Sequence, residues 1–193
     1  MRSWKGRWAL LTAFFISTAC GQDRVQLCAA CHGDDGNSTN PQIPSIAAQP
    51  KLFLENQLIL FREELRKSEQ MAPVVKGMKD PEIIKLAEHF SKLPAKSMEG
   101  GETDKQLSAR GADLGKKHRC NVCHLSDYSG QNQIPRLAGQ REAYLDAEMR
   151  AYRDGKRTGG DTIMAAALYG VSDADIRALA HYLSRSTSRS RAR

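Results

Sequence analysis

Two copies of the pattern Cys-x-x-Cys-His, at residues 28–32 and 120–124, constrain this chain more than any other feature. In heme c attachment, both thiols of such a motif add to vinyl groups on one edge of the porphyrin, and the histidine ligates the iron. One helical turn between the thiols brings both of them to that edge. We therefore predict two covalently bound heme c groups, attached through Cys28, Cys31, Cys120 and Cys123. The predicted proximal iron ligands are His32 and His124.

Paired cysteines also occur in other kinds of site. Four thiolates can bind zinc, but the two pairs are about 90 residues apart, and a zinc site does not need the adjacent histidine. A thioredoxin-like redox pair needs a βαβ context, which the chain lacks. Simple disulfides form in exported proteins. The same histidine offset in both copies favours heme attachment over these three alternatives.

Composition and periodicity indicate a helical fold that depends on its cofactors. Domains of well under 100 residues usually need a metal, a disulfide or a cofactor to complete a stable core. Only 6% of the 193 residues are aromatic, so a large apolar cofactor in each half would complete the core. No alternating apolar pattern suggests a sheet, and the predicted fold class is all-α. Apolar spacing and N-capping patterns predict helices at 51–67, from Asp80, at about 107–117, at 141–154 and from Ser172.

The chain contains an internal repeat. Residues 43–49 match residues 134–140, and the match continues into the last helix of each half with offsets of 91 to 93 residues. A single repetition indicates a duplicated domain rather than a solenoid, for which three or more repeats are expected. We place the first domain at 20–93, a linker at 94–105 and the second domain at 106–185.

The repeat also selects the second iron ligands. Met71 aligns with Met164, whereas Met78 aligns with a valine and Met98 lies in the linker. We therefore predict Met71 and Met164 as axial thioether ligands, with Met78 as the alternative in the first half. Ligation by histidine and methionine raises the reduction potential relative to two nitrogen ligands and leaves no open iron site. Both properties suit electron transfer.

Prolines and arginines recur around these ligands. Pro44 and Pro135 follow their histidines by 12 and 11 residues, and a proline carbonyl there can accept the Nδ1–H of the ligating imidazole. The alternative is that these are ordinary loop prolines. Arg62 and Arg153, with a second recurring arginine pair at 66 and 157, are candidates for heme propionate contacts or for a solvated helix face. We expect the remaining histidines to be surface residues: His89, His118 and His181.

The beginning of the chain predicts export. Basic residues precede the apolar run at residues 8–19, which is too short to span a bilayer, so residues 1–19 are predicted to be a signal peptide. Cys20 is either the residue after an ordinary cleavage site or the acylated first residue of a lipoprotein. The net charge of +7 includes this segment and a basic Ser/Arg tail at 186–193. We predict a periplasmic protein without a nucleic-acid partner.

These features together resemble the class I cytochrome c family, and specifically the tandem diheme proteins of the cytochrome c4 kind. The resemblance covers residues 24–184 and rests on the attachment motif, the Ile-Pro segment, the arginine-bearing helix, the methionine loop and the closing helix, each present twice. It implies two tandem cytochrome c domains, each a small helical bundle around its heme, with electrons passing between the hemes. One departure is that residues 21–27 leave little room for a helix before the first motif.

The resemblance implies a protein that exchanges electrons with redox partners such as a respiratory complex, a terminal oxidase or a dehydrogenase. One alternative is the cytochrome subunit of a periplasmic dehydrogenase, of the flavocytochrome or alcohol dehydrogenase type. A third hypothesis is a diheme enzyme resembling a peroxidase. That enzyme would need one open or displaceable heme site, and the paired methionines argue against it. We therefore predict an electron-transfer protein rather than an enzyme.

Overall fold

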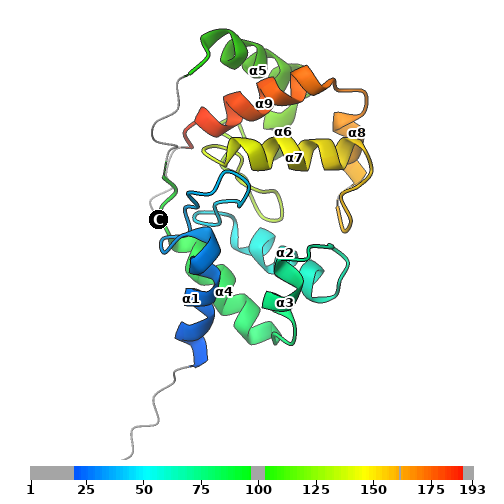
Figure 1. The fold of residues 1–193 in the computed structure, drawn as a ribbon. Coiled ribbons are helices and arrows are strands. Elements are labelled where there is room, and N and C mark those ends of the chain that lie inside the picture. The colour runs from blue at the N-terminus through cyan, green and yellow to red at the C-terminus, as the bar shows by residue number, and fades with distance from the viewer. Residues whose placement is uncertain (1–19, 97–102, 161, 189–193) are drawn as a thin grey trace, which may run out of the picture.

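The computed structural model describes residues 20–96, 103–160 and 162–188, which form two helical halves lying one above the other (Figure 1). The predicted signal peptide, the middle of the predicted linker and the end of the basic tail lie outside these residues. In the part of the chain described, no helix is long and apolar enough to cross a membrane. An isolated bridge between Gln131 and Ile134 is the only strand-like pairing within the described ranges, so the all-α prediction is confirmed.

After the attachment motif, each half contains the same order of helices. The first half comprises α1 (Cys20–His32), α2 (Lys51–Arg62), α3 (Met71–Val75) and α4 (Asp80–Lys92). The second half comprises α5 (Lys105–Lys117), α6 (Cys120–His124), α7 (Glu142–Arg153), α8 (Thr162–Leu168) and α9 (Asp173–Arg185). Equivalent helices are therefore α2 and α7, α3 and α8, and α4 and α9.

The helix boundaries follow from local chemistry. Ser172 caps α9, because its Oγ accepts the Asp175 N–H at 3.2 Å. At the start of α4, the Lys79 N–H donates to Glu82 at 2.9 Å, and Pro81 occupies the first turn. Helix α2 ends at Arg62, five residues before its predicted end, because Glu64 adopts a left-handed backbone with φ 56°.

Each half has its own hydrophobic core, as a duplicated domain requires. The first core joins Cys28 of α1 to buried residues of α2, α3 and α4, with Met71 packed at its edge. The second core joins α5, α7, α8 and α9, with Cys120 and Met164 packed at its edge. In both halves the attachment motif and the candidate methionine therefore contact the same core.

The two halves differ in the helix that precedes the attachment motif. The expectation that the first half has little room for such a helix is wrong, because α1 begins at Cys20 and continues without a break through His32. In the second half, Arg119 has a left-handed backbone with φ 55° and separates α5 from α6. This break turns α5 so that it lies along α9 (Figure 1).

His181 is buried, so its predicted surface position is wrong. Helix α9 packs against both α5 and α7, and His181 is only 5% exposed on the side facing α7. Its Nδ1 lies 3.3 Å from Glu142 Oε1. His89 is exposed and His118 is half-buried. The sequence pattern of α9 did not reveal that two helices cover it.

Close packing of α5 on α9 depends on the absence of a side chain at Gly111. A Cβ at this position would overlap the Ala178 carbonyl oxygen, which belongs to the α9 backbone and cannot rotate away. We predict that Gly111→Ala lowers the free energy of unfolding by about 1–3 kcal/mol despite the higher helix propensity of alanine. Urea denaturation of the holoprotein measures this. Gly115→Ala is the matched control, because its Cβ would meet the movable Tyr128 hydroxyl at 2.8 Å. Equal losses in both variants would contradict the prediction.

Candidate heme sites

The histidine of each attachment motif is held by a proline carbonyl. His32 Nδ1 lies 2.8 Å from Pro44 O, and His124 Nδ1 lies 2.9 Å from Pro135 O. Burial lowers the pKa of both imidazoles, while the hydrogen bond to the carbonyl opposes that shift. With Nδ1 donating to the carbonyl, each neutral ring keeps its Nε2 lone pair free for a metal.

The thiols of each motif run from the core to the surface. Cys28 is buried and Cys120 is half-buried, whereas Cys31 and Cys123 are exposed, and none of the four forms a disulfide. Burial raises the pKa of Cys28 and Cys120, so both are uncharged thiols at neutral pH. A group bonded to both thiols of a motif would therefore have part of its edge in the core and part at the surface.

The donor chemistry fits heme c better than zinc. Among the described residues, no three side chains of the His, Cys, Asp or Glu type are grouped to bind a metal ion. Each half instead offers two thiols, one imidazole with a free Nε2 and a thioether beside the same apolar core. This combination would suit heme c, because the thiols would bond the porphyrin, the core would bury its apolar face, and the imidazole and thioether could ligate its iron.

The candidate methionines lie on equivalent short helices. Met71 is the first residue of α3, and Met164 lies in α8; both are half-buried. Met78 is only 3% exposed, and its aligned partner Val171 is 5% exposed, so both occupy an equivalent packed position. Assignment of Met71 and Met164 as iron ligands stays a prediction.

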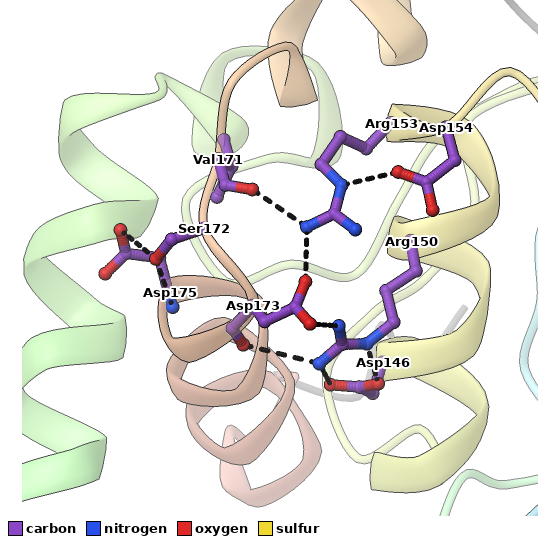
Figure 2. A network of polar contacts seen from close by, with 8 residues as sticks. All are labelled: Asp146, Arg150, Arg153, Asp154, Val171, Ser172, Asp173 and Asp175. Carbon is purple, nitrogen blue, oxygen red and sulfur yellow. Dashed lines mark hydrogen bonds and ion pairs between the residues drawn. The ribbon is translucent and has the colours of Figure 1, made fainter.

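Arg62 and Arg153 each connect a long helix to the turn that follows the methionine helix. Arg62 Nη1 donates to Met78 O at 3.0 Å and to Asp80 at 2.7 Å. Arg153 Nη1 makes the equivalent contacts, to Val171 O at 3.0 Å and to Asp173 at 2.6 Å (Figure 2). Both arginines therefore hold the segment that carries the candidate methionine, and their contact with propionates stays a prediction.

Asp173 is the centre of the polar network shown in Figure 2. Its carboxylate accepts from both Arg153 and Arg150, the latter at 2.5 Å, while Arg150 also pairs with Asp146. These hydrogen bonds lower the pKa of Asp173 to about 2. The first half has only the Arg62–Asp80 pair at the equivalent place, so this turn is held by more contacts in the second half.

Reciprocal hydrogen bonds join the two halves through the repeated 43–49 and 134–140 loops. Gln140 accepts from the Ser45 N–H at 2.7 Å and donates to Ser45 O at 2.8 Å. Gln49 accepts from the Arg136 N–H at 2.9 Å and donates to Arg136 O at 3.0 Å. Because these residues are equivalent pairs in the repeat, the two halves meet across a pseudo-two-fold axis, as in a symmetric dimer.

A second reciprocal contact lies between α2 and α7. Arg66 donates to Gln57 at 2.6 Å and to Glu148 at 3.0 Å. Arg157 donates to Glu148 at 2.5 Å and to Gln57 at 3.0 Å. Arg66 also bonds the Tyr144 hydroxyl at 3.2 Å. The recurring Arg66 and Arg157 therefore face each other inside the interface, where they share one carboxylate.

Arg136 is a buried site residue that the sequence analysis did not single out. It is 2% exposed, and its Nε has no hydrogen-bond partner among the described residues. Its aligned counterpart is Ser45, so the repeat gave no reason to consider it. The available signal was a charged residue inside an otherwise apolar loop.

Comparison with known proteins agrees with this geometry. The family model for cytochrome c matches residues 108–187. Cytochrome c4 of Pseudomonas aeruginosa is 30% identical over 176 residues, which cover 86% of each chain. The reduced recombinant cytochrome c4 of Pseudomonas stutzeri superimposes with a TM-score of 0.79 at 30% identity, covering 89% of this chain and 99% of that one. The thiosulfate dehydrogenase electron acceptor of Thiomonas intermedia is 30% identical, covering 91% of this chain and 85% of its own.

Two helical halves, each with a thiol pair, a buried histidine and a methionine beside one core, define a diheme c-type cytochrome. The chain belongs to the cytochrome c4 family. It is a diheme electron-transfer protein that binds two heme c groups covalently. The predicted family, fold class, function and cofactor are thereby confirmed.

The charge on Asp173 stabilises the second half in a pH-dependent way. The pKa of Asp173 in the folded state lies near 2, below its ordinary value of 3.8, so its contribution is complete above about pH 4 and is lost as the pH falls through 2. We predict that Asp173→Asn is less stable than the parent protein above pH 4 and that this difference disappears near pH 2. Urea denaturation at several pH values measures it.

Asp113→Asn is the matched control for this experiment. Asp113 is 82% exposed and lies 3.8 Å from Lys116, so its removal is expected to change stability little at any pH. A stability difference for Asp173→Asn that stays constant between pH 4 and 2 would show that its charge is not involved.

Proposed function

We propose that this cytochrome carries single electrons through two six-coordinate hemes, with His32 and Met71 as iron ligands in the first half and His124 and Met164 in the second. The observation that carries the proposal is the repeated hydrogen bond from the motif histidine to a proline carbonyl. This bond fixes the tautomer and the ring orientation, and it increases the basicity of the ligating nitrogen.

The contacts around the two candidate methionines support iron sites that are closed to substrates. Equivalent arginines hold the turn after each methionine helix, so the thioether segment is fixed in both halves. Iron with two protein ligands has no position for a substrate, which favours electron transfer over peroxidase chemistry. We propose domain limits of 20–93 and 106–185 with a linker at 94–105; the structure begins α5 at Lys105.

Variants of two neighbouring methionines test the ligand assignment. We expect Met71→Ala to remove about half of the far-red methionine–iron charge-transfer band and to lower one reduction potential. Met78→Ala is the matched control, because Met78 is buried in the core. It is expected to lower the free energy of unfolding by about 2–5 kcal/mol and to leave the band intact.

Absorption spectra of the purified proteins measure the charge-transfer band in each variant, and a pyridine hemochrome assay counts the hemes. Redox titration and urea denaturation measure the reduction potential and the free energy of unfolding. A parent protein with fewer than two hemes would refute the proposed function. Loss of the band in Met78→Ala but not in Met71→Ala would move the ligand assignment to Met78.

The partner that we propose is an exported dehydrogenase that donates electrons to this cytochrome. Relatives at 30% and 28% identity are thiosulfate dehydrogenase electron acceptors, and they match over most of the chain. Copurification of the two proteins, followed by stopped-flow reduction of the cytochrome by the dehydrogenase, tests this choice against a terminal oxidase.

The proposed location is the periplasm, reached by export with residues 1–19 as the signal peptide. Acylation of Cys20 stays a prediction. If Cys20 is acylated, Cys20→Ser is expected to shift the protein from the membrane fraction to the soluble periplasmic fraction, because several acyl chains hold a lipoprotein firmly in the membrane. Cell fractionation with heme staining measures the shift. A parent protein found wholly in the soluble fraction would contradict acylation.

A further inference from the structure

The turn between α3 and α4 carries two exposed positive charges. Lys76 and Lys79 both lie in this turn, and both are exposed. No ion pair joins either lysine to an acidic side chain among the described residues. The next two carboxylates along the chain are already used, because Asp80 pairs with Arg62 at 2.7 Å and Glu82 lies 3.9 Å from an arginine of α1. The protein itself therefore does not neutralise the charge of this turn.

The basic turn belongs to the first half alone. The repeat aligns Lys76 with Tyr169 and Lys79 with Ser172, so the second half has no charge at either position. The equivalent turn between α8 and α9 nevertheless forms, with Ser172 as the cap of α9. Because the same turn folds without lysines in the second half, the two lysines are not needed for the fold.

The start of α1 is fixed beside this turn. Arg24 donates to Val74 O at 3.2 Å and lies 3.9 Å from Glu82. Val74 and Glu82 lie on either side of the basic turn in the sequence, so one side chain of α1 contacts both of its ends. Helix α1 begins at Cys20, four residues before Arg24 or about 6 Å along the helix axis. The first helical residue and the basic turn are therefore neighbours.

The predicted export segment leads directly into this end of the molecule. The apolar residues 8–19 immediately precede Cys20 in the sequence, and no spacer separates them from α1. Figure 1 shows the starts of α1 and α4 at the end of the first half that points away from the second half. A chain held at a membrane through the start of α1 would therefore present the basic turn to the lipid headgroups.

We propose that the start of α1 and the turn with Lys76 and Lys79 form a membrane-facing surface that binds anionic lipid headgroups. The proposal rests on the proposed periplasmic location and adds the orientation of the molecule to it. Lysine side chains are attracted to anionic lipids only within about a Debye length of the surface, so this end must lie close to the bilayer. In this orientation the first half lies against the membrane, and the second half is open to soluble redox partners.

Binding of the purified diheme protein to lipid vesicles tests the surface, with Cys20→Ser as the background so that no acyl chain contributes. At low ionic strength we expect binding to vesicles that contain phosphatidylglycerol and much weaker binding to pure phosphatidylcholine. Each lysine at a charged surface contributes about fivefold to binding, so the pair Lys76→Gln and Lys79→Gln is expected to weaken it by about 25-fold. Sedimentation of the vesicles with detection of heme absorbance measures the bound fraction.

The pair Lys116→Gln and Lys117→Gln is the matched control, because both lysines are exposed at the end of α5 in the second half and their removal changes the net charge equally. Its binding is expected to stay within about twofold of the background protein. Equal losses in the two pairs would show that binding follows net charge alone and would overturn the proposal.

A different result would assign the basic turn to a protein partner. Unchanged vesicle binding of the Lys76 and Lys79 pair, together with slower reduction by the proposed dehydrogenase, would have this meaning and would overturn the membrane-facing surface. The proposed function has a separate readout. Fewer than two hemes in the parent protein, or a parent protein that is not exported, would refute that function whatever the vesicles show.

Discussion

The arrangement of the whole protein depends on the loops at 43–49 and 134–140. In each loop a proline carbonyl accepts the hydrogen bond of a motif histidine, and the next residue bonds a glutamine of the other half. One short segment therefore orients a candidate iron ligand and forms the interface between the halves. Because the proline fixes its own φ angle, the loop backbone itself holds the proline carbonyl and the following residue in position for these two bonds.

The interface between the halves is polar, and its reciprocal hydrogen bonds specify how the two halves are aligned. The glutamines at 49 and 140 and the arginines at 66 and 157 are equivalent positions, so each bond in these two reciprocal sets has a symmetric counterpart. The pseudo-symmetry is broken at few places. Glu148 stands where the first half has Gln57, and Arg136 stands where it has Ser45. Each substitution places a single charge in the interface, and two charges of one sign at the axis would repel each other.

Much of the fold followed from the sequence, because the signals were local or repeated. The attachment motifs, the capping residue Ser172 and the aligned methionines indicated a duplicated helical cytochrome. The features that could not be predicted from the sequence depend on tertiary contacts. The burial of His181 arises because two helices cover α9. The burial of Arg136 depends on contact between the two halves, since its side chain bonds Ala47 of the first half. The recurrence of arginine at 62 and 153 is a sequence signal, but the bonds of these arginines to the turn carbonyls depend on tertiary contacts between the helices.

The position of the outer cysteines has a consequence for how electrons reach the protein. Cys31 and Cys123 are exposed, while the inner cysteine of each pair contacts or enters the core. A porphyrin edge bonded to these outer sulfurs would lie at the boundary with solvent, where a partner could approach it. Electron exchange at each edge is then governed by collision and alignment of the two proteins, and the covalent anchors keep the tunnelling distance constant from one encounter to the next.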